Sequence, residues 1–343
     1  MRCVTCWLGM ISLAATLVAQ QPATAPASQP ELTGVARLRQ EASALVPLVK
    51  SELGKRFLGA TAELPAIKAR TLYIDQEKKM YISKAEYDGL SQEARGKVKV
   101  AERDEDFYYD TKYGSPLAYA RPLELLAKAG FADVNGKRIL DYGYGTVGHL
   151  RLLATLGADV VGVDVDPMLP LLYGEPGDQG EIKSRAGLRG RVTMVNGRWP
   201  AEAPAKESVG AKFDLIISKN TLKNGYLHPE QKVDPRMLVN LGVEEEAFVQ
   251  ALHDALNPGG LLLIFNICPA RTPPGPKYIP WSDGRCPFSK ELLEKSGFEV
   301  LVFDQDDTAA VQAQARALGW DKGPQPMDVE KDLYALYTLA KRK

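Results

Sequence analysis

The chain has 343 residues, of which 45% are hydrophobic and 25% are charged, as in an ordinary globular protein. It carries 43 Lys and Arg residues and 43 Asp and Glu residues, so its formal net charge at pH 7 is zero. This balance argues against nucleic acid as the main partner, because binding to a phosphate backbone depends on clustered positive charge.

The N-terminus has the pattern of a secretory signal. An uncharged apolar run over residues 6–19 follows Arg2 and is too short to span a membrane comfortably. We expect a signal peptide over residues 1–20, cleaved near Ala19, and then a Pro/Ala-rich linker over 21–31. The mature protein would be periplasmic or secreted, with no stable membrane span. The alternatives are a buried N-terminal helix, an uncleaved anchor, or a misread start or signal that leaves the protein in the cytoplasm.

Residues 32–120 are expected to form a mainly helical extension and a lid. Apolar residues recur at helical spacing over 33–57, which predicts an amphipathic helix. Two β-prone pieces, 71–74 and 80–82, predict a hairpin. Residues 83–86 carry the Ser-x-x-Glu pattern of a capping box, which opens a short helix.

Residues 121–343 are expected to form an α/β domain. A short helix is predicted over 122–130, and after it short apolar runs alternate with helical stretches. The seven predicted strands cover residues 138–141, 160–164, 191–195, 213–217, 261–265, 299–303 and 333–339. Apolar strands separated by helices indicate a doubly wound, mostly parallel sheet with helices on both faces. We expect an antiparallel last strand, and a helix over 308–318 that crosses before it is a compatible alternative.

A glycine-rich turn follows the first of these strands. Gly143 and Gly145 let the backbone turn tightly and approach a ligand, and a helix that begins near Val147 points its N–H groups at the same place. About 20 residues after the turn, Asp164 ends the second strand, where a carboxylate can accept both hydroxyl groups of a ribose. The turn therefore predicts the binding site of a cofactor that contains a nucleoside.

The same turn also satisfies the dinucleotide fingerprint, because glycine recurs at 143, 145 and 148. Three features favour S-adenosylmethionine over NAD. Asp141 lies two residues before the first glycine, where its charge would repel a pyrophosphate but would suit the ammonium group of an amino acid. Residues 213–218 look like the fourth strand of methyltransferases, and residues 256–260 look like the turn before their fifth strand.

Together these features resemble the class I S-adenosylmethionine-dependent methyltransferase family, over about residues 107–343. The resemblance implies that Asp164 binds the ribose of S-adenosyl-L-methionine and that Val165 lies against the adenine. The residues that it assigns to the methionine half are Asp141, Gly143 and Gly145.

Two positions depart from the family pattern. Tyr144 stands between the glycines, where a small residue is common, and its ring would either pack under the turn or narrow the site. Asn196 follows the third strand, where the family often has an acidic residue that meets the adenine amine. Asn196 is our candidate for contact with the base, because its amide carries both a donor and an acceptor.

Two flanking segments are expected to add cofactor contacts. Residues 107–115 resemble the N-terminal lid of many small-molecule methyltransferases. Tyr109 and Tyr113 in this lid would cover the sulfonium, whose positive charge is attracted to an aromatic face. The alternative is that these tyrosines pack the N-terminal helices onto the sheet. Ser218 ends the fourth strand and would place a hydroxyl at the edge of the pocket.

The methyl acceptor is expected beyond the carboxyl ends of the fourth and fifth strands. A long Pro-rich loop over 266–288 lies there, and loops of this length in a compact domain are usually functional. The substrate-binding candidates are Lys219, Asn220, Trp281 and Arg285. Asp283 and His228 are candidates for a general base, which is needed only if the acceptor is protonated. The alternative for His228 is that it caps a loop.

Cys268 and Cys286 would either form a disulfide at the base of this loop or remain two buried thiols. No metal site is expected, because no cluster of His, Cys and carboxylate residues has a ligand spacing. The sequence thus predicts an S-adenosylmethionine-dependent methyltransferase that acts on a small molecule or a side chain. The alternatives are an NAD-dependent oxidoreductase and an exported methyltransferase-fold protein that binds a ligand without turnover.

Overall fold

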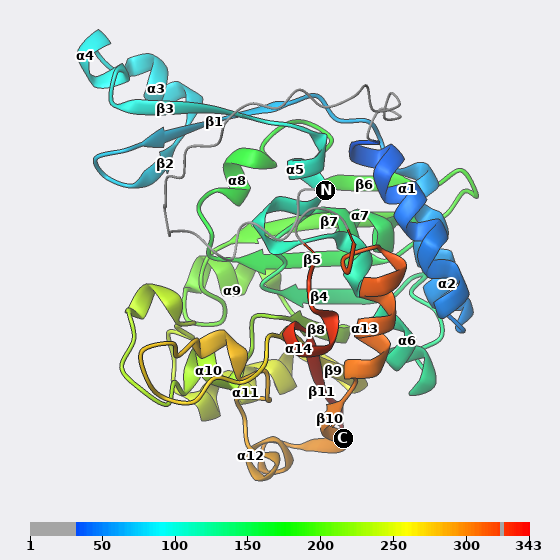
Figure 1. The fold of residues 1–343 in the computed structure, drawn as a ribbon. Coiled ribbons are helices and arrows are strands. Elements are labelled where there is room, and N and C mark those ends of the chain that lie inside the picture. Colours follow the sequence, from blue (N-terminus) through cyan, green and yellow to red (C-terminus); the bar gives the residue numbers. More distant parts are fainter. Residues whose placement is uncertain (1–31, 323–325) are drawn as a thin grey trace, which may run out of the picture.

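The computed structural model describes residues 32–322 and 326–343, so the expected signal peptide and linker lie outside the described residues. An eight-stranded sheet forms the centre of the protein, with helices on both of its faces (Figure 1). Its strands lie in the order β10-β11-β9-β8-β4-β5-β7-β6. The strands are β4 (Arg138–Tyr142), β5 (Asp159–Asp164), β6 (Gly180–Lys183), β7 (Arg189–Asn196), β8 (Phe213–Lys219), β9 (Leu256–Cys268), β10 (Phe298–Asp306) and β11 (Tyr334–Arg342).

The mostly parallel, doubly wound sheet is confirmed, and all seven expected strands form. The last strand, β11, is antiparallel to both of its neighbours, β9 and β10, as the sequence predicts. The expected number of seven strands is wrong, because β6 adds an eighth strand that pairs antiparallel with β7 at the edge of the sheet. Its sequence, Gly-Glu-Ile-Lys, lacks the apolar run that marks a buried strand, so the hydrophobic pattern gives no sign of it.

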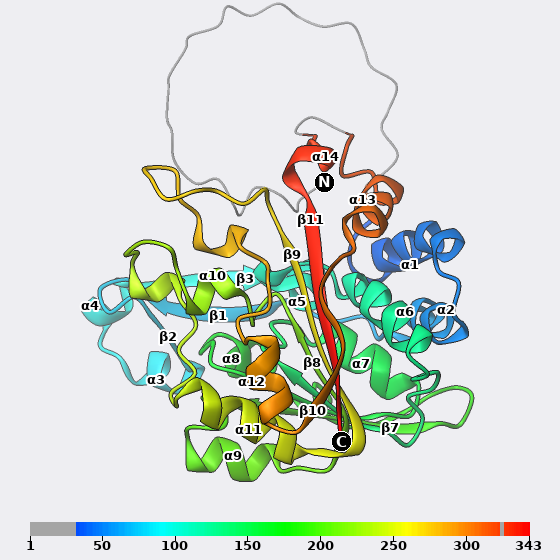
Figure 2. The same cartoon turned by 90° about the horizontal axis from the view of Figure 1, so that it is seen from below.

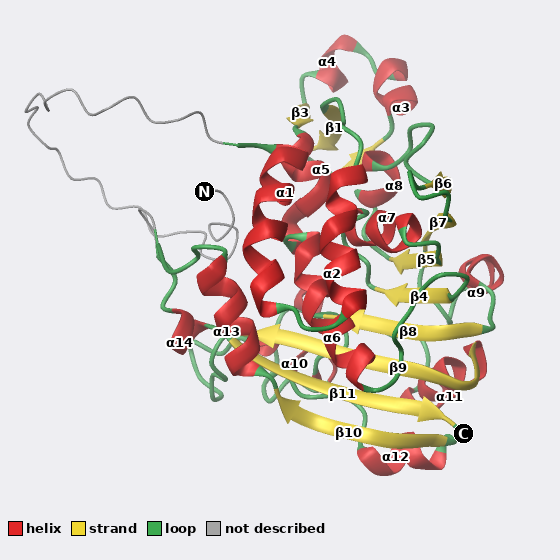
Figure 3. Ribbon diagram, turned by 90° about the vertical axis from the view of Figure 1, so that its right-hand side faces the viewer, coloured by secondary structure: helices red, strands yellow, loops and turns green. Residues whose placement is uncertain are grey.

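Side chains of the central strands alternate between two hydrophobic cores, one on each face of the sheet. On β8, Leu215 and Ile217 belong to one core and Ile216 to the other. Figures 2 and 3 show the helical layers that cover these faces. The first layer contains α6 (Ala120–Lys128), α7 (Gly148–Thr155) and α13 (Thr308–Ala317), together with the N-terminal helices. The second contains α9 (Ala203–Val209), α11 (Glu245–Ala255) and α12 (Lys290–Lys295).

The helix expected over residues 33–57 is two helices in the structure. They are α1 (Gly34–Leu45) and α2 (Glu52–Gly59), and a 3₁₀ turn over Val46–Leu48 separates them. Pro47 explains the break, because proline has no N–H to donate and its ring clashes with the preceding turn of a helix. The buried side chains of both helices join the first core, so the extension and the sheet share one continuous hydrophobic interior.

The rest of the extension contains a small antiparallel sheet that projects from the body of the protein (Figure 1). The expected hairpin is confirmed, and a third strand, which the sequence analysis missed, pairs with its first strand. The expected capping box is also present, with Ser83 and Glu86 bonded reciprocally. The elements of this region are β1 (Arg70–Asp75), β2 (Met80–Ile82), α3 (Lys84–Gly89), α4 (Gln92–Arg95), β3 (Val98–Arg103) and α5 (Glu105–Asp110).

Three short helices lie in the connections of the main domain, and these are α8 (Leu169–Leu172), α10 (Asn224–Leu227) and α14 (Val329–Asp332). Within the described ranges, no helix is long and apolar enough to cross a membrane. The strands β4, β5, β8 and β9 run parallel, so their carboxyl ends lie along the same edge of the sheet. The connections that follow these four strands carry the candidate site residues.

Candidate functional site

The glycine-rich turn between β4 and α7 has the backbone shape that the sequence predicts. Gly143 and Gly145 have positive φ angles of 79° and 57°, which residues with a side chain rarely adopt. The side chain of Thr221 lies directly against Gly143. A Cβ atom on Gly145 would lie only 2.8 Å from the ring of Tyr113. Both conformation and space therefore require glycine at these two positions.

Asp164 at the end of β5 connects this turn to the next loop. Its Oδ2 accepts a hydrogen bond from the N–H of Gly145 at 3.0 Å, and its Oδ1 accepts one from the N–H of Asp166 at 2.9 Å. Burial raises the pKa of the Asp164 carboxyl, and these backbone hydrogen bonds oppose the rise. A carboxylate oxygen can accept more than one hydrogen bond, so Asp164 keeps the capacity to bind ribose hydroxyls.

Val165 and Asn196 lie beside Asp164, where the sequence analysis expects the adenine. The side chain of Val165 is 58% exposed, so it is available for contact with a ligand ring. The Nδ2 of Asn196 donates to the backbone oxygens of Asp164 and Asp166, at 3.2 and 3.1 Å. Asn196 thus holds the loop that carries Val165, and its own contact with a base stays a prediction.

The lid segment lies on the glycine turn through three side chains. Thr111 Oγ1 donates to the backbone oxygen of Gly145 at 2.9 Å. The hydroxyl of Tyr113 donates to Asp166 Oδ2, and Lys112 forms an ion pair with the same oxygen, both at 2.7 Å. Burial alone would raise the pKa of Asp166, but the hydrogen bonds from Lys112, the Met168 N–H and Tyr113 lower it overall.

The two tyrosines of the lid differ in what they contact. Tyr109 is fully buried, and its hydroxyl donates to the Pro65 backbone oxygen at 2.6 Å, so it packs the extension onto the sheet. Tyr113 is exposed and its ring lies against Gly145, and its contact with the cofactor stays a prediction. Tyr144 is buried against Gly162 of β5, so it packs under the turn.

A buried polar pair lies beneath the glycine turn, and the sequence analysis did not identify it. Asp141 Oδ2 and His149 Nε2 are 2.6 Å apart, and both side chains are fully buried. The ring of Tyr119 stacks on that of His149 with 3.7 Å between the ring centres. Burial lowers the pKa of His149 despite the opposing charge of Asp141. In the part of the chain that the structure describes, Asp141 Oδ1 has no hydrogen-bond partner.

Of the polar residues around the end of β8, Ser218 and Asn220 form hydrogen bonds within the protein, whereas Lys219 lies near an aromatic ring. Ser218 is fully buried, and its Oγ accepts from the Leu222 N–H at 3.3 Å, which directs it into the turn and away from the pocket edge where we expected it. Asn220 Oδ1 accepts from the Ile267 N–H at 2.7 Å, so Asn220 joins β8 to β9. Lys219 Nζ lies 5.5 Å from the centre of the Tyr119 ring. Burial lowers the pKa of Lys219 to about 8.

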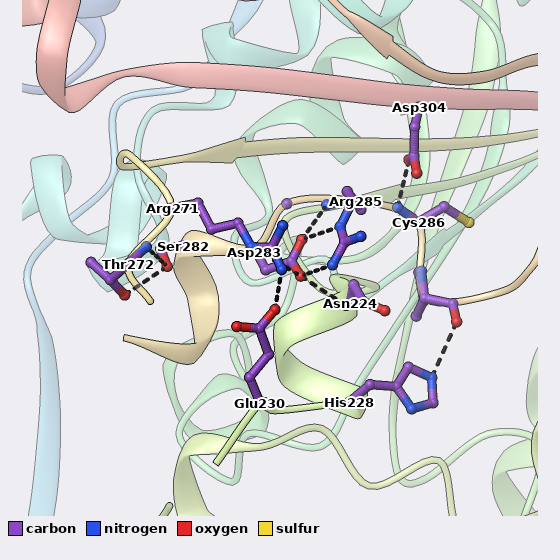
Figure 4. Close-up of polar contacts among 12 residues, drawn as sticks. Asn224, His228, Glu230, Arg271, Thr272, Ser282, Asp283, Arg285, Cys286 and Asp304 are labelled. Carbon is purple, nitrogen blue, oxygen red and sulfur yellow. Dashed lines mark hydrogen bonds and ion pairs between the residues drawn. The ribbon is translucent and has the colours of Figure 1, made fainter. Parts of the chain in front are cut away.

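The Pro-rich loop after β9 is held by one buried carboxylate (Figure 4). Asp283 accepts from Arg285 Nε and Nη2 at 2.9 and 2.6 Å and from Asn224 Nδ2 at 2.8 Å. Burial opposes ionisation, but these donors outweigh it and lower the pKa of Asp283 to about 2. A carboxylate that already accepts from these donors is a weak base, so the contacts of Asp283 do not support our expectation of a general base.

The contacts of Arg285 and Trp281 show how these two substrate-binding candidates are held within the loop. The guanidinium of Arg285 is bound by Asp283, and the half-buried Trp281 lies in a 3₁₀ turn over Pro280–Ser282. The backbone N–H of Asn224 donates to the Arg285 oxygen at 2.8 Å, which ties the loop to α10. A contact between either side chain and a substrate stays a prediction.

His228 directly follows α10 as its C-cap residue. Its Nε2 is 3.1 Å from the Pro287 backbone oxygen (Figure 4). The same atom lies 3.0 Å from Glu245 Oε1. These contacts correspond to the alternative in which His228 caps a loop, and they do not support its assignment as a general base. Cys268 and Cys286 are both buried free thiols, so the disulfide alternative is not formed. No group of three metal-ligating side chains converges within residues 32–322 and 326–343.

Comparisons with known proteins place this geometry in context. A family model that describes a methyltransferase domain matches residues 115–303, which is more than half of the chain. Comparison with curated proteins gives no match.

Several solved structures resemble the chain at low identity. A candidate sarcosine dimethylglycine methyltransferase from Galdieria sulphuraria is 16% identical, with 76% of this chain and 90% of that chain covered and a TM-score of 0.41. An S-adenosylmethionine-dependent methyltransferase from Mesorhizobium loti is 18% identical, with 66% and 98% covered and a TM-score of 0.37. Phosphoethanolamine N-methyltransferase 2 from Haemonchus contortus, in complex with S-adenosyl-L-methionine, is 14% identical, with 71% and 62% covered and a TM-score of 0.36.

Proposed function

The chain belongs to the methyltransferase-domain family, and we propose that it transfers the methyl group of S-adenosylmethionine to a small molecule bound beyond β8 and β9. The family assignment makes S-adenosylmethionine the cofactor and sets aside the NAD-dependent alternative. The observation that carries the proposal is the turn after β4, in which Gly143 and Gly145 have positive φ angles and the N–H of Gly145 donates to Asp164 Oδ2 at 3.0 Å.

The residues of the site fit this cofactor. The buried Oδ1 of Asp141 makes no hydrogen bond of good geometry within the described residues, which leaves an acceptor for an ammonium group near the turn. Asp164 would bind the ribose, and the exposed Val165 would contact the adenine. Tyr113, which lies over Gly145, would place its ring near the positive sulfonium.

When it is bound, S-adenosylmethionine supplies a methyl group that the sulfonium already activates. The protein therefore needs mainly to position the acceptor and exclude water, and orientation alone can provide much of the rate. The balanced charge of the chain gives no support for a nucleic-acid partner.

Calorimetry with S-adenosylmethionine and S-adenosylhomocysteine tests the proposal on the wild type and on Asp164→Ala. We expect both ligands to bind the wild type and the variant to bind at least roughly ten-fold more weakly, because it loses charge-assisted hydrogen bonds to the ribose. Equal binding by both proteins would refute the site assignment. Saturable NAD binding without S-adenosylmethionine binding would refute the function. Binding without methyl transfer to any acceptor in a screen would favour the non-catalytic alternative.

We also propose that the protein is exported, with a signal peptide over residues 1–20 that is cleaved near Ala19. The support is the charged and apolar pattern of residues 1–19 and the Pro/Ala-rich segment that follows. Because S-adenosylmethionine is made in the cytoplasm, export would require a supply of cofactor outside it. Fractionation of the cell with N-terminal sequencing tests this proposal. An intact N-terminus in the cytosol would disprove it and leave the methyltransferase assignment untouched.

A further inference from the structure

Lys219 is a poorly compensated cation beside the glycine turn. Asp141 lies opposite Ile217 in the register of β4 and β8, so Lys219, two residues further along β8, lies beside the start of the turn. Within the described residues, its Nζ makes no hydrogen bond or ion pair, and it lies 5.5 Å from the centre of the Tyr119 ring. A partly buried cation that lacks a direct anionic partner is costly, so an anionic ligand would stabilise it.

Lys223, four residues later, differs from Lys219 because its Nζ has a hydrogen-bond partner within the protein. Its Nζ donates a 2.6 Å hydrogen bond to the backbone oxygen of Ile267, and its side chain is buried. Burial lowers the pKa of Lys223 to about 8, as it does for Lys219. The two lysines therefore share a similar environment, but the head group of Lys223 already has a partner in the protein.

Asp141 supplies the opposite charge next to Lys219. The charge of Asp141 acts on Lys219, and that of Lys219 acts on His149, which places the three groups in one cluster. One oxygen of Asp141 is bound to His149, and the other makes no hydrogen bond of good geometry within the described residues. The Tyr119 hydroxyl lies beside this carboxylate, whose charge helps to raise the pKa of Tyr119. The ends of β4 and β8 thus present an acceptor and a cation side by side, which is complementary to the zwitterionic end of an α-amino acid.

We propose that Lys219 binds the α-carboxylate of the methionine moiety, while the free oxygen of Asp141 accepts from its α-ammonium group. This inference rests on the proposed function and adds to it the recognition of the amino-acid end of the cofactor. Lys219 was expected to bind the substrate, and a carboxylate on the acceptor is the competing source of the same chemistry. The test must therefore separate the carboxylate of the cofactor from that of an acceptor.

Three ligands that share the adenosine and the thioether isolate this contact. S-adenosylhomocysteine carries the full amino acid, decarboxylated S-adenosylhomocysteine lacks only the carboxylate, and 5′-methylthioadenosine lacks the amino acid altogether. For the wild type, calorimetry is expected to show a roughly ten- to hundred-fold preference for S-adenosylhomocysteine over its decarboxylated form, the size of a charge-assisted hydrogen bond. In Lys219→Met this preference should fall to near one, while 5′-methylthioadenosine binds as it does to the wild type.

Lys223→Met is the matched control, because it removes a neighbouring lysine of similar environment whose head group is already bound. It should keep the preference for the carboxylate, and Lys219→Arg should keep most of it. If the wild type binds S-adenosylhomocysteine but Lys219→Met retains the full preference, the inference is wrong and the proposed function stands. Equal wild-type affinity for the two forms also overturns the inference and requires no variant to fold. If the wild type binds none of the three ligands, the proposed function itself fails.

Discussion

The Asp141 carboxylate and the His149 imidazole are joined by a 2.6 Å hydrogen bond between two fully buried side chains. Asp141 lies near the end of β4 and His149 in the first turn of α7, so this contact spans the glycine turn and links its two ends. The hydrogen bond between Asp141 and His149 thus stabilises the shape of the cofactor turn from within the protein.

We predict that His149→Leu destabilises the fold by about 3 kcal/mol, because a buried carboxylate then loses its hydrogen-bond donor. Urea denaturation of the wild type and the variant measures this loss. A double-mutant cycle with Asp141→Asn supplies the control, and we expect a coupling energy above about 1 kcal/mol for two side chains in direct contact. Additive losses would show that the two residues stabilise the protein independently.

This pair also shows where prediction from the sequence stops. The glycines and Asp164 could be identified because their function depends on local backbone shape and on spacing along the chain. The Asp141–His149 bond and the ring of Tyr119 above it depend on how α7 folds back over β4, which no local pattern encodes. The only sequence signal was a histidine directly after the last glycine of the turn, and isolated histidines rarely identify a partner.

The same distinction holds for the fold. All seven expected strands carry apolar runs. Burial on both faces explains this pattern for the parallel strands. β10 and β11 are antiparallel, and Leu301 and Phe303 of the edge strand β10 are exposed although they belong to an apolar run. The edge strand β6 and the third strand of the small sheet were missed, since each is only partly buried and interleaves charged residues. The break at Pro47 was missed because the apolar spacing continues on both sides of it. Proline stereochemistry overrode the periodicity there.

Tyr113 is expected to distinguish the charged cofactor from its neutral product. We predict that Tyr113→Ala lowers the affinity for S-adenosylmethionine roughly ten-fold more than the affinity for S-adenosylhomocysteine. The reason is that only the positively charged sulfonium is attracted to an aromatic face. Tyr113→Phe is the control, since it keeps the ring over Gly145 and removes only the hydroxyl that donates to Asp166. Parallel calorimetric titrations measure both affinities. An equal loss for the two ligands would mean that Tyr113 acts through shape alone.

Lys219 at the end of β8 and Lys223 in the turn after it predict a rise of stability with pH. In the folded protein the pKa values of Lys219 and Lys223 are lowered from 10.5 to about 8. The unfolded chain therefore binds more protons above pH 8, so the free energy of unfolding increases as the pH rises. This contribution of the two neutral lysines to the free energy of unfolding is present at high pH and is lost as the pH falls through about 8. Urea denaturation between pH 8 and about 9.5, below the ordinary tyrosine pKa, measures it.

Other groups face these two lysines and must be considered in that experiment. Asp141 and the ring of Tyr119 face Lys219, while Cys268 and the ring of Tyr226 face Lys223. Burial raises the pKa values of both tyrosines, so they remain neutral in the folded protein over this range. The variant that replaces both lysines by methionine should therefore show a flatter pH dependence than the wild type. An unchanged slope would assign the effect to another group.

The ion pair between the buried Asp283 and the partly exposed Arg285 predicts acid sensitivity of the Pro-rich loop. The pKa of Asp283 is lowered from 3.8 to about 2, so its contribution to stability is full above pH 3.8 and is lost as the pH falls through 2. Asp283→Asn should be clearly less stable than the wild type at neutral pH, and the difference should shrink between pH 4 and about 2.

Asp234 and Arg236 offer a matched control for that prediction, because they repeat the Asp-x-Arg spacing on the surface. Arg236 also donates to Asp234 and lowers its pKa to about 2, but this carboxylate lies in solvent, where a bond to water replaces the lost partner. Asp234→Asn should therefore change the unfolding free energy far less than Asp283→Asn. Proteolysis of the loop over 269–288 gives a second readout, since only Asp283 also holds Asn224 of α10. Equal effects of the two substitutions would show that burial does not strengthen the Asp283 pair.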